Sequence, residues 1–268
     1  MQIQEISSLQ NPRIKELVHL LEKSRERRRQ GLMVVEGLRE ISLALQSGVQ
    51  PQALFFCGRR TAPEQLQSLL ARGGSMPLFD LKEEVFAKIA YRDGVANAVL
   101  LGKAPETTLA QFQPRNSRII LIEGVEKPGN LGAVFRSADA SGCGGIVVCD
   151  PAADLFHPNV LRSSLGCVFA VPAAVCTGEE LLPWLQAEQY RLITTYMDSP
   201  GGWTELDLRG KTAVALGTEA VGLSDIWRET AAANLRIPMK GLIDSLNVSN
   251  AAAVIMYELQ RQQDASHA

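Results

Sequence analysis

The sequence predicts an α/β protein made of two units, each with alternating strands and helices. Short apolar segments alternate with longer amphipathic segments along most of the chain, and Gly and Pro residues separate them. The composition, with 46% hydrophobic and 21% charged residues in 268, is ordinary for a globular protein of one or two domains. Such alternation is typical of α/β folds with a largely parallel sheet.

The first unit begins with a predicted helix over residues 12–29. Asn11 can cap this helix, and Pro12 stands at its first position, where a missing backbone N–H costs nothing. Further helices are expected at 38–46, 63–71 and 82–90, and strands at 32–35, 53–57, 77–80 and 96–101. These elements are enough for a small α/β domain.

A polar segment with two prolines, PETTLAQFQPRN at 105–116, is the best candidate for a linker. The expected division is therefore a domain at 1–105, a linker at 106–116 and a domain at 117–268. Residues 1–115 hold 16 Lys and Arg against 12 Asp and Glu, whereas the remainder holds 11 against 17. A polyanion would meet the N-terminal half first, although its basic run at 23–29 is also consistent with a solvated helix end.

The second unit repeats the alternation. Strands are expected at 119–123, 146–149, 168–171, 191–196, 211–216 and 236–238, and helices at 130–142, 159–164, 179–187 and 248–262. Their order again predicts parallel strands joined by helices.

Several classes of protein are disfavoured by the sequence. The five cysteines form no C-x-x-C pair and no cluster with histidine, so reduced thiols are expected, without a disulfide or a metal site. No segment resembles a signal peptide or a membrane span, so a cytoplasmic location is expected. A serine hydrolase would need His157, but no G-x-S-x-G motif accompanies it, and a loop role is expected.

Three polar loops of the second unit follow predicted strands, at residues 124–130, 217–222 and 239–247. In an open parallel sheet, ligands bind at the carboxyl ends of the strands. We therefore expect the three loops to line one ligand site.

The first loop leads into the helix that carries Arg136. A turn is expected at 128–129, with Asn130 as the cap of the following helix. One face of this helix is apolar and is formed by Leu131, Val134, Phe135 and Ala138. Arg136 lies off that face among small neighbours, so its guanidinium is either solvated or available for a phosphate.

The second loop has two glycines at the spacing of a phosphate-binding loop. Leu223 stands where that motif needs Lys, which disfavours a nucleotide-hydrolysing enzyme. Gly217 and Gly222 still permit a close backbone approach to a flat ligand. Glu219 places a carboxylate on this loop, interpreted either as a site residue or as an exposed acid.

The third loop precedes a small, apolar helix over 248–259. Ser245, Asn247 and Ser249 are its candidate N-caps. The pattern fits a capped, buried C-terminal helix, and it also fits a polar loop that holds a ligand at the helix entrance.

Three motifs together resemble those of a known family, in the same order and spacing. They are EKPGNLGAVFRSADASG (126–142), ALGTEAVGLS (215–224) and IPMKGLIDSLNVSNAAAVIMYEL (237–259). They are similar to the SpoU, or TrmH-like, family of RNA ribose 2′-O-methyltransferases. The segment at 32–48 resembles, less closely, the family's ribosomal-protein-like substrate-binding domain.

The resemblance implies an S-adenosylmethionine (AdoMet)-dependent homodimer with a C-terminal trefoil knot, acting on structured RNA, with ribosomal RNA favoured over transfer RNA. The catalytic residues that it implies are Asn130, Arg136, Glu219, Ser245 and Asn247. The cofactor-binding residues that it implies are Leu216, Gly217, Ile237, Met239 and Leu246. The chain departs from the family at Lys127, where many members have an acid immediately before the proline.

The implied chemistry requires a proton to leave a ribose hydroxyl. Arg136 is the family's leading candidate to handle that proton, but arginine is normally protonated. The other interpretation is that Arg136 binds the adjacent phosphate and stabilises the developing alkoxide. A non-catalytic RNA-binding protein with the same fold is the alternative function, and the presence of all five implied catalytic residues favours the enzyme.

Overall fold

The computed structural model describes residues 3–90, 97–196, 199, 204, 206–217 and 222–265. Its contacts divide the chain into two compact units. The first unit consists of Met1–Pro105 and Asp154–Ala170, and the second consists of Glu106–Ala153 and Val171–Ala268. The segment 154–170, which interrupts the second unit in sequence, therefore packs with the first.

The first unit has a five-stranded sheet in the order β1-β4-β3-β5-β2. Its strands are β1 (Ile3–Ile6), β2 (Leu32–Glu36), β3 (Pro51–Phe56), β4 (Leu78–Leu81) and β5 (Ala98–Lys103). Its helices before residue 105 are α1 (Pro12–Glu22), α2 (Ser24–Gln30), α3 (Leu38–Gln46), α4 (Pro63–Gly73) and α5 (Glu83–Ile89). β5 runs antiparallel to both of its neighbours, and the strand β1 was not predicted.

The helix predicted over 12–29 is wrong in one respect, because the chain forms two helices that meet at Lys23. Asn11 caps α1 and Pro12 starts it, as predicted. Lys23 then takes an extended conformation with φ −114° and ψ 100°, which interrupts the helix. The turn carries Arg27 of α2 back to the end of α1, where its Nη1 donates to the carbonyls of Leu20 and Leu21. A buried tertiary contact has thus replaced the continuous helix.

The predicted strand at 168–171 is also wrong. Cys167–Ala170 form the short helix α8, which follows α7 (Pro158–Ser163), and the strand β8 comes later at Ala173–Cys176. Gly166 has φ +81°, and a Cβ there would lie 2.9 Å from Leu43 of α3. The apolar segment is therefore buried against α3 instead of joining a sheet.

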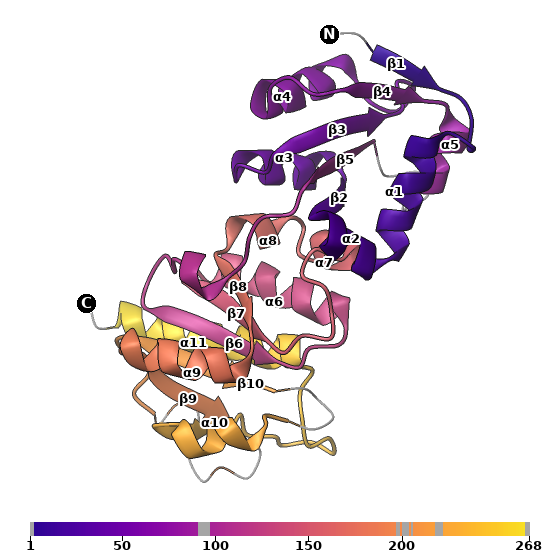
Figure 1. The fold of residues 1–268 in the computed structure, drawn as a ribbon. Coiled ribbons are helices and arrows are strands. Elements are labelled where there is room, and N and C mark those ends of the chain that lie inside the picture. Colours follow the sequence, from indigo (N-terminus) through magenta and orange to yellow (C-terminus); the bar gives the residue numbers. More distant parts are fainter. Residues whose placement is uncertain are drawn as a thin grey trace. The chain divides into compact units, whose positions relative to one another are not determined.

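The second unit has a six-stranded, wholly parallel sheet in the order β11-β9-β10-β6-β7-β8 (Figure 1). Its other strands are β6 (Arg118–Glu123), β7 (Gly145–Cys149), β9 (Arg191–Thr195), β10 (Thr212–Leu216) and β11 (Ala233–Leu235). The helices are α6 (Pro128–Ala140), α9 (Gly178–Ala187), α10 (Asp225–Thr230) and α11 (Val248–Asp264), with a 3-10 turn at Leu109–Gln111. A parallel sheet needs cover on both faces, which explains its nearly continuous apolar strands.

Helices cover both faces of this sheet. α9 and α10 pack on one face, where Leu181, Leu185 and Trp227 join the core. α6 and α11 pack against each other and contact β7 and β6 respectively. The predicted apolar face of α6 is confirmed, since Leu131, Val134, Phe135 and Ala138 are all buried.

Two boundaries in the second unit differ from prediction. The last strand ends at Leu235, before the predicted range 236–238, because pairing with β9 involves Ala233–Leu235. The short helix α10 was not predicted. α6 begins at Pro128, so Lys127 is its N-cap and Asn130 lies inside its first turn.

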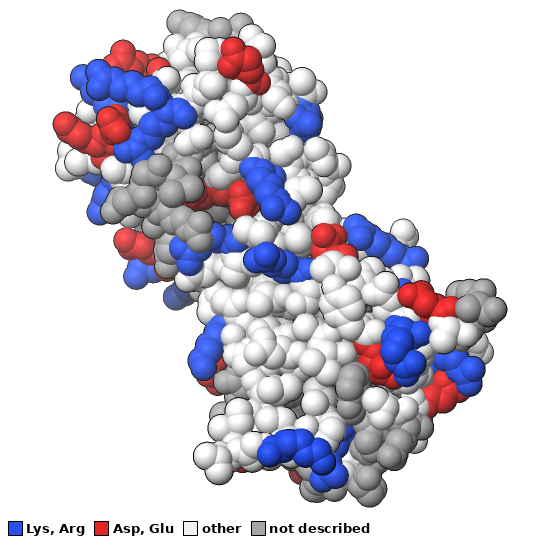
Figure 2. Space-filling model, turned by 180° about the vertical axis from the view of Figure 1, so that it is seen from behind, with Lys and Arg blue, Asp and Glu red and all other residues white. Residues whose placement is uncertain are grey.

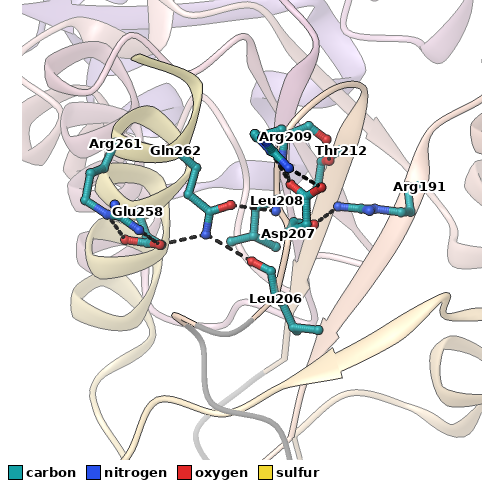
Figure 3. A network of polar contacts seen from close by, with 9 residues as sticks. All are labelled: Arg191, Leu206, Asp207, Leu208, Arg209, Thr212, Glu258, Arg261 and Gln262. Atoms are coloured by element: carbon teal, nitrogen blue, oxygen red, sulfur yellow. Dashed lines mark hydrogen bonds and ion pairs between the residues drawn. The ribbon is translucent and has the colours of Figure 1, made fainter. Parts of the chain in front are cut away.

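A polar network holds the end of α11 to the segment before β10 (Figure 3). The side chain of Gln262 accepts a hydrogen bond from Leu208 N (2.7 Å) and donates to Leu206 O (3.0 Å). It also donates to the carboxylate of Glu258, which is 4% exposed and ion-paired with Arg261. These bonds fix the start of β10 at the end of the sheet opposite to its ligand-facing loops.

Candidate active site

The predicted loops leave the sheet close together at the carboxyl ends of its strands. β6 and β10 are neighbours, and their last residues, Ile122 and Leu216, are register partners. The third loop begins after β11 at the sheet edge and returns to the start of α11, which packs against α6. The fold thus brings the entrances of α6 and α11 together.

Asn130 and Asn247 meet where these two helices begin. The Asn247 side-chain amide Nδ2 donates a hydrogen bond to Asn130 Oδ1 at 3.2 Å. Of the three candidate N-caps of α11, Asn247 is the one that the structure uses, since its Oδ1 accepts from Ser249 N (2.9 Å) and Ser249 Oγ (2.6 Å). The cap fixes the direction of the amide, so its N–H group is aimed at the first loop. The expected capping role of Asn130 is wrong, and its side chain contacts α11 instead.

Arg136 and Ser245 are placed less closely. Arg136 is exposed on α6, nearly two turns beyond Asn130, which is about 9 Å along the helix axis. Among the described residues it forms no hydrogen bond or ion pair, so its five N–H donors face solvent. Ser245 is half-buried, and its hydroxyl donates to Asp244 Oδ1 at 3.2 Å. The structure therefore gathers Asn130 and Asn247 directly, while Arg136 remains an outward-facing cation on the same helix.

The predicted cofactor residues lie at the end of β10 and in the segment between β11 and α11. Leu216 is buried at the end of β10. A Cβ on Gly217 would lie 2.0 Å from the carbonyl carbon of Gly222, so only glycine fits and the loop returns to its own start. Glu219 lies outside the described residues, which omit 218–221. Ile237, Met239 and Leu246 are half-buried.

These residues fit a flat, partly apolar cofactor. Their half-buried aliphatic side chains can cover an adenine ring, and the glycine permits backbone contact with it. Among the described residues, no group of three or more His, Cys, Asp or Glu side chains could hold a metal ion. No helix in the described part of the chain is both long and apolar enough to cross a membrane.

The sequence reasoning missed Glu123, the last residue of β6. Its carboxylate accepts hydrogen bonds from Ser224 N (2.8 Å), Ser224 Oγ (2.6 Å) and Trp227 Nε1 (2.7 Å). The signal that could have revealed it is an acid directly after four apolar residues, at the point where a strand enters a ligand-facing loop. A charge there needs a local partner.

His157 belongs to the first unit. It caps α7, with its Nδ1 accepting from Asn159 N at 3.0 Å. Burial lowers the pKa of its imidazole, and the nearby Arg27 guanidinium lowers it further. The neutral form that accepts the capping bond is thereby favoured.

Comparison with known proteins identifies the second unit. A profile of the family described as SpoU rRNA methylase matches residues 117–257. The chain belongs to the SpoU rRNA methylase family. A second profile, described as an MRM3-like substrate-binding domain, matches residues 11–99 of this SpoU methylase. The resemblance drawn from the three motifs is therefore confirmed.

Similar proteins extend over almost the whole SpoU methylase chain. A 23S rRNA (uridine(2479)-2′-O)-methyltransferase of Streptomyces viridochromogenes is 31% identical over 94% of this chain and 91% of its own length. A crystal structure of an RNA 2′-O ribose methyltransferase is 38% identical, with a TM-score of 0.82 over 97% of this chain and 99% of that one. The AviRb methyltransferase of S. viridochromogenes, solved with AdoMet, is 30% identical, with a TM-score of 0.87 over 94% and 98%.

These findings confirm the expected α/β fold and the expected class of enzyme, an RNA ribose 2′-O-methyltransferase. They also confirm the expected cofactor at the level of the family, because a similar structure holds AdoMet.

Proposed function

We propose that this chain transfers a methyl group from AdoMet to a ribose 2′-hydroxyl of 23S rRNA. The observation that carries the choice of substrate is the similarity, along nearly the full length of both chains, to a 23S rRNA 2′-O-methyltransferase. A sugar target is supported by the described loop residues, which offer amide and hydroxyl groups and no aromatic side chain for gripping a base, and by the guanidinium of Arg136 on α6. A cytoplasmic location is proposed, since ribosomal RNA is the proposed substrate.

In this proposal each loop has a separate task. Leu216, Gly217, Ile237, Met239 and Leu246 would hold AdoMet, which supplies an electrophilic methyl group when bound. Methyl transfer is an in-line displacement, so catalysis depends on holding the hydroxyl at the right distance and angle. Asn130, Asn247 and Ser245 would orient the ribose hydroxyl, and Glu219 belongs to the same set.

Arg136 is proposed to bind the phosphate beside the target ribose. Its exposure and lack of partners among the described residues leave the guanidinium free to form a bidentate contact with phosphate oxygens. A fixed cation there stabilises the alkoxide that develops as the hydroxyl loses its proton.

RNA binding is assigned to the domain 1–105, with 106–116 as the linker and 117–268 as the methyltransferase domain. Arg25, Arg28 and Arg29 of α2 are exposed, but Arg27 of the same run is 2% exposed and unavailable to RNA. On the face drawn in Figure 2, Lys and Arg side chains stand in small groups with acidic side chains among them. Contact with a folded RNA at several separate points fits this distribution.

A homodimer is proposed as the active form. Leu242 and Ile243, in the loop that carries Ser245, are 107% and 64% exposed, and Tyr257 on α11 is 52% exposed. Large apolar side chains in such positions are stabilised when a second copy covers them. Sedimentation that shows an active monomer at micromolar concentration would contradict this assignment.

The central test uses 23S rRNA incubated with methyl-labelled AdoMet and then digested with alkali. Alkaline cleavage needs a free 2′-hydroxyl, so a 2′-O-methyl group leaves a labelled, resistant dinucleotide. Label found only in mononucleotides would mean base methylation and would refute the proposed reaction. Transfer RNA treated in parallel is expected to remain unlabelled, and labelling of transfer RNA alone would refute the proposed substrate.

A further inference from the structure

Glu123 connects two neighbouring strands at the edge of the proposed cofactor site. It ends β6, and its three hydrogen bonds reach Ser224, directly before α10, and Trp227 inside α10, the first helix after β10. More than one hundred residues separate the partners in sequence. We propose that Glu123 is a positioning residue for the cofactor, acting through the loop after β10. This inference rests on the proposed assignment of that loop to AdoMet.

The loop after β10 has a single closing point. Gly217 leaves β10, and its Cα lies so close to Gly222 and Leu223 that a Cβ would be 2.0 Å from Gly222 and 2.3 Å from Leu223 N. Gly222 has φ +71°, which glycine adopts without strain. The two ends of the loop are therefore in contact. Whatever fixes the chain after Gly222 also fixes the position of Gly217.

The chain that returns from this loop is fixed at Ser224. Its N–H and its hydroxyl both donate to Glu123, and its carbonyl accepts from the Tyr196 hydroxyl at 3.4 Å. The guanidinium of Arg228 lies 4.1 Å from the centre of the Tyr196 ring. Ser224 precedes α10 but its side chain does not cap that helix, because the hydroxyl is already committed to Glu123. All three polar groups of Ser224 thus hold the loop end.

The bonds that Glu123 accepts require a carboxylate. Glu123 receives three donors, and an ionised carboxylate is an acceptor at both oxygens. One of the donors is the indole N–H of Trp227, whose side chain is fully buried in the core beneath α10. A glutamine would turn an NH2 group toward Ser224 N or toward the indole, leaving a donor facing a donor. The shape of the side chain would be kept while the anchor would be lost.

The variant that tests the role is Glu123→Gln, with Glu188→Gln as the matched control. Glu188 pairs with Lys211 on the surface, about half exposed, so the control makes the same chemical change without touching Ser224. Ser224→Ala removes one of the three hydrogen bonds and preserves the backbone donor. AdoMet dissociation constants are measured by calorimetry and RNA dissociation constants by filter binding, for the full-length chain.

Glu123→Gln is expected to weaken AdoMet binding about tenfold or more, which corresponds to the loss of one or two hydrogen bonds to a charged group. Ser224→Ala is expected to weaken it by a smaller factor, while RNA affinity stays within about twofold for every variant. Turnover at saturating AdoMet should recover much of the wild-type rate, so the KM for AdoMet changes more than kcat. A purely structural role would lower both affinities together.

Two outcomes would overturn the inference: AdoMet binding by Glu123→Gln that matches the Glu188→Gln control, or equal losses of AdoMet and RNA affinity. If Glu123→Gln does not fold, Ser224→Ala decides the question by the same two measurements. Failure of the wild-type chain to bind AdoMet would refute the proposed function itself. That result differs from the two outcomes above, in which the wild-type chain binds AdoMet.

Discussion

The buried ion pair between Arg27 and Asp154 should be the most sensitive single contact of the first unit. Arg27 Nε donates to Asp154 Oδ2 at 2.8 Å, and the two side chains are 2% and 9% exposed. Arg27 Nη1 is satisfied by carbonyls of α1, whereas its Nη2 has no partner among the described residues. Asp154→Ala would leave this guanidinium buried without a counter-charge. Breaking a buried pair from one side costs about 3–5 kcal/mol of unfolding free energy.

The control is Asp207→Ala, which removes the partner of Arg209 in a pair where both side chains are more than half exposed. That change should hardly move the urea midpoint, because exposed pairs are screened by water. The double variant Arg27→Met, Asp154→Leu should regain most of the loss, since it removes both charges.

Urea unfolding can separate the two units in this experiment. All three tryptophans lie beyond residue 171, in the second unit, so their fluorescence follows that unit, while far-ultraviolet circular dichroism follows both. Asp154→Ala should shift the dichroism transition and leave the fluorescence transition nearly in place. A loss of stability no larger than that of Asp207→Ala would refute the reasoning that burial sets the cost.

Three further predictions follow from individual residues. Arg136→Ala should abolish turnover with little change in AdoMet affinity by calorimetry, because Arg136 is on neither cofactor loop; affinity lost in step with activity would contradict its role. Gln262→Ala should lower the free energy of urea unfolding by about 1–3 kcal/mol, because it leaves the Leu208 N–H and the Leu206 carbonyl without their side-chain partner. A change near zero would show that water replaces the amide. Burial raises the pKa of the Cys143 thiol to about 11, so at pH 8 only about one thiol in a thousand is ionised. Iodoacetamide should therefore label Cys143 rapidly only in urea. Labelling of the folded protein at the same rate as in urea would contradict this.

Much of the local structure was predictable because its signals lie within a few residues. Asn11 followed by Pro12 predicted the start of α1. The polar residues before the small apolar helix predicted that α11 is capped, and Asn247 is the one of three candidates that caps it. The apolar strands β6, β7, β9 and β10 of the second unit were likewise predicted from composition and order. The three motifs predicted the family, because their residues, order and spacing resemble those of its members.

Other features depended on contacts between distant parts of the chain. The helix break at Lys23 accompanies the burial of Arg27 against Asp154, which lies 127 residues further along the chain. The residues next to Lys23 in the sequence do not indicate this break. The segment predicted as a strand at 168–171 became helix α8 because packing against α3 outweighed its β-propensity.

The candidate site shows the same division. The sequence by itself determined which polar side chains stand in the three loops, since every loop follows a predicted strand and contains glycine, and the third adds Ser245 and Asn247. Only the tertiary structure decided that Asn130 contacts Asn247 instead of capping its helix, and that Glu123 anchors the loop after β10. A side-chain hydrogen bond depends on distances of about 3 Å, and strand order and helix packing set those distances between residues that are more than one hundred positions apart.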